Sequence, residues 1–224
     1  MSFVLKAGGK QMDDHLLRFA KDKKFTFIDC ETFNLCLNEF NNLPWQIAII
    51  ETLGAEKIVN KHDFYVGWDT ELRISKEAKR ITKFDDVKFA AKKLPAEECI
   101  RKTHEVLKNS DYIVGHNLLG FDVYLLRIAF KKFGLDWKFI MPKILDTFAL
   151  MKGVRLESKY KAGSDLLAYQ YKQIHTIKSR LKCALGTLGK EFSIDHDADK
   201  LHDALADLEL NLKVWNKIKY LIEV

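Results

Sequence analysis

The sequence predicts a single α/β domain, and three observations support this fold class. The chain begins with three apolar runs rich in β-branched and aromatic residues, 25–31, 45–52 and 57–66, separated by turn residues. Helical periodicity then alternates with shorter apolar runs, an order typical of α/β proteins. The 224 residues are enough to bury one sizeable core, and three prolines and eleven glycines mark no long linker. We therefore expect one domain over residues 1–224.

The first three strands are expected to pair in meander order. The run 57–66 should lie antiparallel to 45–52 across a turn at Gly54, which gives a mixed or antiparallel half-sheet. Ahead of the strands, residues 11–21 have the apolar spacing of a short helix.

Helices and short strands are expected to alternate beyond this half-sheet. Ser75 is a good N-cap for a helix through Ile81, and Pro95 suits the first turn of a helix that ends near Lys108. The remaining expected elements are a strand at 111–114, a helix from Gly120 to Gly134, an apolar piece at 144–150, a helix at 183–192 and a last helix at 203–222.

The composition, 47% hydrophobic and 30% charged, is ordinary for a soluble globular protein. No apolar run has the length of a membrane span, and the N-terminus lacks the apolar region of a signal peptide, so we expect a cytoplasmic protein without a membrane partner. Four scattered cysteines favour reduced thiols over a disulfide framework or a zinc site. A net charge of +6 indicates either a polyanionic partner or a lysine-rich surface.

The first apolar run ends in two carboxylates, Asp29 and Glu31, with Cys30 between them. Because strand side chains alternate, the two acids share one face and Cys30 points to the other. Like charges near a core are costly, and a divalent cation with hard oxygen ligands, magnesium or manganese, would remove that cost. The alternative is a strand that has reached the surface and ends in two solvated acids.

A second acidic motif follows the expected strand at 111–114. A loop leads to Asp122 in the first turn of a helix, where a carboxylate stabilises the helix dipole or, alternatively, is delivered toward the first two acids. The third motif is His202-Asp203-Ala204-Leu205-Ala206-Asp207. On one helix His202 and Asp207 would differ by about 140°, so we place His202 in the loop or cap before the helix. Taken alone, the motif is also compatible with an acid that only stabilises the start of a helix and with a histidine that lies at the surface or in the core.

Taken together, the motifs resemble the DEDDh (DnaQ-like) 3′-to-5′ exonucleases of the RNase H-like superfamily. The phrases that carry the resemblance are Phe-Ile-Asp-Cys-Glu-Thr, Leu-Pro-Trp-Gln-Ile-Ala, Ile-Val-Gly-His-Asn-Leu-Leu-Gly-Phe-Asp and His-Asp-Ala-Leu-Ala-Asp, in an order that matches over residues 24–215. Leu145-Asp146-Thr147 also occupies the place of a family Asp-Thr pair. The resemblance implies an RNase H-like fold, a five-stranded mixed sheet flanked by helices.

The resemblance also implies the chemistry of the site. Its metal ligands would be Asp29, Glu31, Asp122 and Asp207, which hold two Mg²⁺ or Mn²⁺ ions. Two such ions about 3.5–4 Å apart activate a water and stabilise a leaving oxyanion. His202 would be the general base, since an imidazole near its own pKa accepts a proton at neutral pH.

Substrate-binding residues are expected in two loops. By resemblance, the turn formed by Thr32, Phe33, Asn34 and Leu35 receives the terminal nucleotide, and the loop with His116 and Asn117 contributes to binding. Phe33 or Leu35 could stack on a base, although a core position is the alternative, which we favour for Leu35. Relatives often have glycine where this chain has Asn34, which changes the placement of the 3′ end and leaves the metal site intact.

The segment 151–182 is basic and tyrosine-bearing. Its charged and aromatic members are Lys152, Arg155, Lys159, Lys161, Lys172, Lys178, Arg180 and Lys182 with Tyr160, Tyr169 and Tyr171. This mixture is typical of single-stranded nucleic-acid binding, and we hypothesise that the segment grips the strand upstream of the cut. The alternative is a solvated loop or helix pair.

We therefore expect a metal-dependent 3′-to-5′ exonuclease that acts on single-stranded DNA and releases 5′-mononucleotides. An exoribonuclease that trims RNA is an alternative, because the residues do not reveal contacts to a 2′-hydroxyl. A catalytically silent nucleic-acid-binding module on the same fold is another, although four acids and a histidine argue against it. A polymerase or a replication or repair protein is expected as a partner only in the form of a separate chain.

Overall fold

The structure is a computed structural model that describes residues 17, 20–35, 42–70, 72–196, 203–222 and 224. Its elements are β1 (Lys24–Thr32), β2 (Pro44–Leu53), β3 (Lys57–Gly67), α1 (Lys76–Thr82), α2 (Asp86–Lys92), β4 (Lys93–Pro95), α3 (Ala96–Lys108), β5 (Tyr112–Gly115), α4 (Asp122–Lys132), the 3₁₀ helix η2 (Lys138–Lys143), β6 (Ile144–Asp146), α5 (Thr147–Arg155), α6 (Leu166–His175), α7 (Leu185–Glu191) and α8 (Ala204–Ile218). Most of the short helix expected at 11–21 lies outside the described residues.

The strands form one mixed sheet in the order β4-β3-β2-β1-β5-β6. β1, β2 and β3 pair antiparallel as a meander, and the β1–β5, β5–β6 and β3–β4 pairs are parallel. The mixed sheet flanked by helices confirms the expected fold class. The expected number of strands was wrong, because the sheet has six in the part of the chain that the structure describes.

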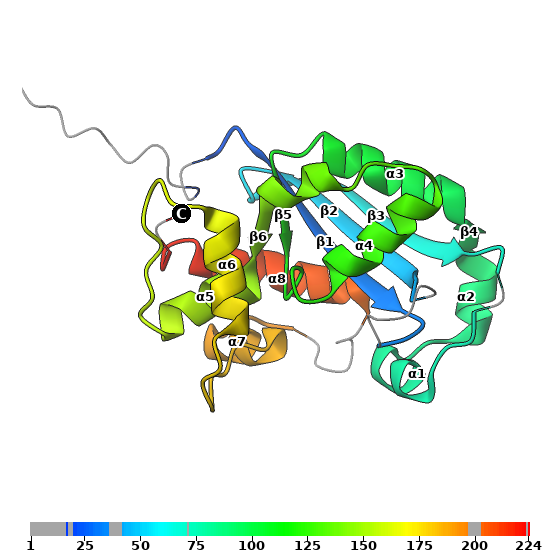
Figure 1. Ribbon diagram of the computed structural model, residues 1–224. Coiled ribbons are helices and arrows are strands. Elements are labelled where there is room, and N and C mark those ends of the chain that lie inside the picture. The colour runs from blue at the N-terminus through cyan, green and yellow to red at the C-terminus, as the bar shows by residue number, and fades with distance from the viewer. Residues whose placement is uncertain (1–16, 18–19, 36–41, 71, 197–202, 223) are drawn as a thin grey trace, which may run out of the picture.

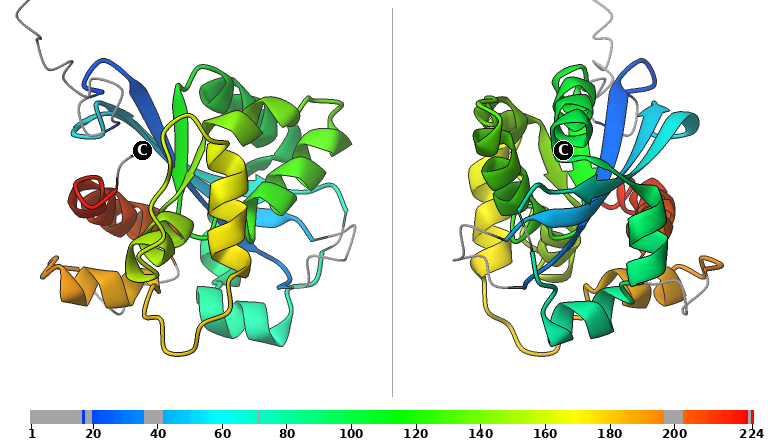
Figure 2. Two further views of the ribbon diagram at one scale, coloured as in Figure 1. Left: turned by 60° about the vertical axis from the view of Figure 1, so that its left-hand side comes forward. Right: turned by 90° about the vertical axis from the view of Figure 1, so that its right-hand side faces the viewer.

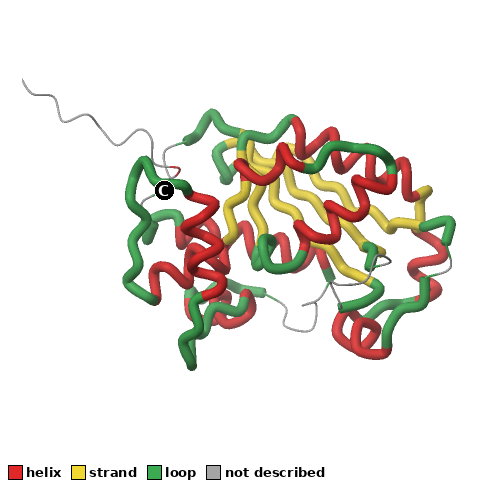
Figure 3. Tube along the Cα trace, viewed as in Figure 1, coloured by secondary structure: helices red, strands yellow, loops and turns green. Residues whose placement is uncertain are grey.

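Helices cover both faces of the sheet (Figure 1), and one buried cluster lies on each face. On one face, Ile28 and Cys30 of β1 pack with α3 and α4, while on the other Phe25 and Phe27 pack with α8. This alternation along β1 continues to its end and decides which face receives the carboxylates. The tube view shows the same three layers, with helices on both sides of the strands (Figure 3).

Two short elements near the β3 edge were not expected. Helix α2 begins after Asp85, whose carboxylate accepts the N–H groups of Val87 and Lys88, yet none of its residues is buried. Strand β4 is three exposed residues that end at Pro95, a position that a sheet edge tolerates. Because neither element buries a hydrophobic stripe, the apolar pattern of the sequence did not reveal them.

Helices α5, α6 and α7 gather beside the β6 edge of the sheet (Figure 2). The apolar piece expected at 144–150 is two elements, since β6 ends at Asp146 and this residue caps α5 through the N–H groups of Phe148 and Ala149. The basic segment 151–182 contains the end of α5, a loop and α6. No helix among the described residues has the length and apolar character needed to span a bilayer.

Candidate active site

The acidic end of β1 continues the strand's alternation onto the α8 face. Phe25 and Phe27 lie in the cluster with α8, so Asp29 and Glu31, two and four residues later, face the same side. In the antiparallel pair of β1 and β2, Asp29 lies opposite Ala48, a small buried residue that leaves room beside the carboxylate. Cys30 packs into the opposite cluster, as the sequence predicted.

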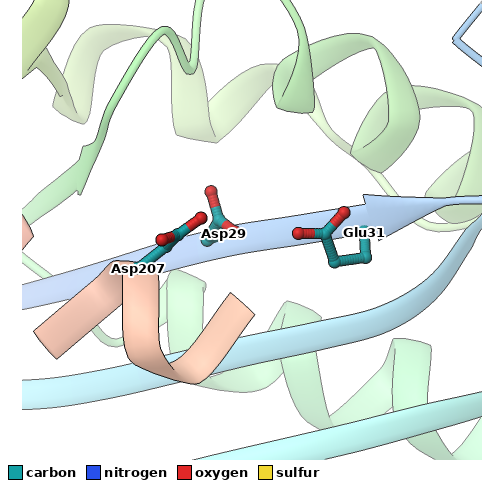
Figure 4. Close-up of side chains that lie close together, drawn as sticks. All are labelled: Asp29, Glu31 and Asp207. Atoms are coloured by element: carbon teal, nitrogen blue, oxygen red, sulfur yellow. The ribbon is translucent and has the colours of Figure 1, made fainter. Parts of the chain in front are cut away.

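Helix α8 supplies the third carboxylate from its first turn. Asp203 caps the helix by accepting the N–H groups of Leu205 and Ala206, which places Asp207 one turn further on. Trp215 anchors the helix against β1, with its ring 5.9 Å from that of Phe25. One oxygen from each of Asp29, Glu31 and Asp207 lies within 4.8 Å of the other two, and Figure 4 shows the three side chains turned toward one another.

Asp122 reaches β1 from the start of α4. Parallel pairing with β5 stops at Phe27 and Val114, so the last residues of β1 have a free edge on that side. The Asp122 carboxylate, 4% exposed, accepts the backbone N–H of Cys30 at 2.9 Å. It lies outside the group of three, yet its charge raises the pKa of Asp29 and Glu31.

The electrostatics of this cluster favour a cation. Burial, followed by the neighbouring carboxylates, raises the pKa of Asp29 and of Glu31 well above the ordinary values. Burial also raises the pKa of Asp122 to about 7, despite the hydrogen bonds that lower it. Ionising these groups together is therefore costly in the protein alone. Clustered carboxylate oxygens of this kind fit Mg²⁺ or Mn²⁺, which would neutralise them.

The loop before α4 is fixed by hydrogen bonds to the Asp146 carboxylate. One of its carboxylate oxygens accepts the N–H of Asn117 at 3.0 Å, and the other accepts that of Leu119 at 2.9 Å. Asn117 has a left-handed backbone, with φ of 62°, which the loop requires for this turn. Burial raises the pKa of Asp146 to about 6, and these hydrogen bonds oppose the shift.

His116 is fixed by a second network. Its Nδ1 lies 3.0 Å from the Thr147 hydroxyl oxygen, which also lies 3.1 Å from the Gly115 carbonyl oxygen and 2.9 Å from the Asn211 side chain. Burial lowers the pKa of His116 to about 4, while a hydrogen bond to the backbone of Cys183 opposes the shift. The histidine is therefore neutral at pH 7 and joins the loop after β5 to the segment before α7.

Sequence analysis missed two members of these networks. Gln170 of α6 accepts the N–H of Asp146 and donates to Ile144, and Asn211 of α8 contacts Thr147. Both are polar residues that the structure buries, and a buried polar side chain needs a hydrogen-bond partner. Their partners lie too far along the chain to be read from spacing.

The expected nucleotide-receiving turn is only partly exposed. Thr32 is buried and its hydroxyl contacts Asn42 and Leu43. Phe33 is 7% exposed and packs with Phe84 and Phe89. Leu35 is 41% exposed, so the core position favoured for it was wrong. The turn leaves the sheet before Leu35, which therefore has no buried face to join.

A hollow of about 660 Å³ opens beside the carboxylates. Its lining includes Asp29 and Asp207, then His116, Asn117 and Phe148 from two other elements, and the start of α7 with Lys190. Of the expected substrate-binding residues, His116 and Asn117 thus reach the hollow. The expected general base, His202, lies outside the described residues.

The basic segment 151–182 divides into buried and exposed parts. Lys152 is 9% exposed and donates to the carbonyl of Ile174, and Arg155 pairs with Glu191. Lys152 thus joins α5 to α6, and Arg155 joins α5 to α7, so these two basic residues have structural contacts within the protein. Lys178, Arg180 and Lys182 are exposed in the loop that leads into α7.

Comparison with known proteins agrees with this geometry. The family described as RNase_T, exonuclease, matches residues 26–215. The chain belongs to this exonuclease family. The match confirms the predicted relationship to the DnaQ-like, RNase H-like exonucleases and, with it, an enzyme of the exonuclease class. A search of curated proteins gave no match.

Solved structures show the same fold for this exonuclease. A structure of exonuclease I matches with a TM-score of 0.69 and 21% identity over 89% of the chain. E. coli exonuclease I in complex with a dT13 oligonucleotide matches with a TM-score of 0.69 and 22% identity over 88% of the chain. A complex described as ExoI/SSB-Ct has a TM-score of 0.69 and 20% identity over 89%. In each case the chain spans 41% of the other protein's length.

Proposed function

We propose that this exonuclease hydrolyses the phosphodiester bond at the 3′ end of single-stranded DNA and releases 5′-mononucleotides, with two divalent ions. The observation that carries the proposal is the convergence of Asp29, Glu31 and Asp207, whose oxygens lie within 4.8 Å of one another at the edge of a hollow. A hollow of this size accommodates a nucleotide, since ligand sites commonly measure about 300–1,000 Å³.

The residues divide the chemistry between them. Asp29, Glu31 and Asp207 would hold one ion, and Asp29 with Asp122, through water, would hold the other. Bound there, such ions supply an activated water and stabilise the leaving oxygen. Asp122 also orients β1 through the Cys30 N–H. His202, which precedes the cap of α8, would accept the proton of the attacking water.

Single-stranded DNA is the proposed substrate on two grounds. Exonuclease I, whose fold the chain shares, was solved with a dT13 oligonucleotide. The exposed cations Lys178, Arg180 and Lys182 lie in the loop that runs into Ala184, a lining residue of the hollow, and such cations bind a strand's phosphates. A polymerase, or a replication or repair protein, acting as a separate chain remains our expectation for a protein partner.

The test is degradation of end-labelled strands of DNA and RNA with Mg²⁺, Mn²⁺ or chelator. We expect stepwise shortening from the 3′ end, release of 5′-mononucleotides, faster loss of DNA than RNA, and no reaction in chelator. Shortening from the 5′ end would refute the polarity. Faster loss of RNA would assign the chain to RNA trimming, and metal-independent cleavage would remove the role given to the carboxylates.

A further inference from the structure

Part of the hollow's lining comes from α7 and the residue before it. Helix α7 is held against α8 by its buried side, where Leu188 lies in the core and Gly189 makes a close approach. A side-chain carbon at Gly189 would lie 2.8 Å from the ring of His196 and 3.0 Å from Leu210. This packing fixes α7 relative to the helix that carries Asp207.

The other side of α7 faces the hollow. Gly186, Thr187 and Lys190 all line it, and Thr187 and Lys190 are three residues apart, which places them on one helix face. Lys190 is exposed, and no side chain in the described part of the chain forms an ion pair with its ammonium group. The ammonium group is therefore available to a ligand in the hollow.

Among the described residues that line the hollow, Lys190 is the one that carries a positive charge at pH 7. His116 is neutral at pH 7, because its pKa is lowered to about 4 by burial. The two lining acids, Asp29 and Asp207, are those that would hold metal. An anion bound to such ions would lie in the same hollow as the Lys190 ammonium group.

The geometry points to Lys190, with the hydroxyl of Thr187, as the group that binds a strand phosphate at or next to the terminal nucleotide. This inference rests on the proposed function, since the anion is the backbone of the single-stranded nucleic acid whose 3′ end lies at the carboxylates. The ring of Phe148 lines the same hollow, 5.7 Å from that of His116, and offers an apolar surface to the sugar or base. Lys190 is a binding residue for the phosphate, and the carboxylates remain the site of bond cleavage.

The experiment measures binding of fluorescent oligothymidylates in chelator, over a range of salt concentrations. The variants are Lys190→Ala, Lys190→Arg and Lys217→Ala. Lys217 is the matched control, because it is an exposed lysine in the last turn of α8, as Lys190 is in the last turn of α7. Equal melting temperatures of the variants establish that each is folded.

We expect Lys190→Ala to weaken binding about tenfold, the effect of losing one charge-assisted hydrogen bond. The slope of log affinity against log salt should fall by about 0.7, the value for one phosphate contact on a single strand. Lys190→Arg should restore the slope, and Lys217→Ala should leave both quantities unchanged. A trinucleotide and a longer strand should lose the same factor, because the contact lies at the 3′ end.

Equal slopes for Lys190→Ala and Lys217→Ala would overturn the inference. So would a loss that is confined to the longer strand, because the contact would then lie away from the hollow. A parent chain that binds strands through Lys190 but shortens none of them in Mg²⁺ would support this contact and refute the proposed hydrolysis. If the parent chain shortens strands normally and Lys190→Ala leaves the salt slope unchanged, the proposed hydrolysis is supported and the Lys190 contact is refuted.

Discussion

The hollow beside the carboxylates has two walls that differ in charge and in depth. The acidic wall consists of side chains on β1 and α8, elements that bury Phe25, Phe27 and Trp215 between them. The basic wall is formed by Lys190 of α7, and three further exposed cations, Lys178, Arg180 and Lys182, lie in the loop before α7. One wall is therefore fixed by the core of the protein, and the other is fixed only where Leu188 and Gly189 pack.

The two walls differ because coordinating a metal ion and binding a strand's phosphates have different physical requirements. Ligands for a small cation must be held at defined separations, and buried carboxylates keep them there at a cost in stability. Contacts to a strand's phosphates act through charge, which tolerates longer and more mobile side chains. The acidic wall should consequently respond to single substitutions by large factors, and the basic wall by small, additive ones.

The largest effect is expected for Asp207→Asn. Losing one metal ligand should lower turnover by about 10³-fold or more, because the ions would supply several kcal/mol of transition-state stabilisation. Glu209→Gln on the same helix is the control, since Glu209 is exposed and pairs only with Lys61 among the described residues. Single-turnover rates on a labelled strand measure both variants. Comparable losses in the two would show that Asp207 acts through the stability of α8.

His202→Ala should lower turnover by about 10²–10⁴-fold, the range typical of a lost general base. Binding of Mn²⁺ should be retained, because the carboxylates would still hold the ions. Calorimetric titration with Mn²⁺ measures the second property, and His175→Ala, at the exposed end of α6, serves as the control. Turnover close to that of the parent chain would remove the base assignment.

The acidic wall was predicted from the sequence because its signals are local. The alternation of β1 and the position of Asp122 at a helix start can both be recognised within a few residues. That Asp29 and Asp207 converge followed only from the family resemblance, since no local rule relates residues so far apart.

The basic wall could not be predicted in the same way. Exposed lysines look alike in a sequence, and only the packing of α7 and α6 distinguishes Lys190 in the hollow from Lys152, whose ammonium group is buried against the Ile174 carbonyl. The networks through Gln170 and Asn211 likewise depend on tertiary contacts. Leu35 was misjudged because apolar character alone does not show where a strand leaves the sheet.

A moderate effect is expected on the pH dependence of stability. Asp122 has an ordinary pKa of 3.8 and a folded pKa of about 7, so the folded chain binds more protons between these values. In chelator, the free energy of unfolding should therefore fall as pH rises from about 4 to about 7, by at most about 1.4 kcal/mol per pH unit for this group. Denaturant unfolding at several pH values measures the slope.

Two further measurements test whether the carboxylate cluster causes this pH dependence. Asp122→Asn should flatten the slope, because the titrating group is gone. Saturating Mg²⁺ should oppose the fall, since the ions bind the ionised carboxylates and stabilise the folded chain. A stability that rises with pH in chelator would contradict the raised pKa values.

The smallest effects are expected for the exposed cations in the loop before α7. Neutralising Lys178, Arg180 and Lys182 one at a time should each lower the salt slope of strand binding by about 0.7 and leave the melting temperature unchanged. Lys152→Ala should instead lower the melting temperature and leave the salt slope unchanged. Its buried ammonium group stabilises the end of α6 and is hidden from solvent. Fluorescence titrations and thermal unfolding on the same four variants separate the two behaviours. Unchanged slopes for all three exposed cations would mean that the strand approaches the hollow by another route, with Lys190 as its remaining contact on this side.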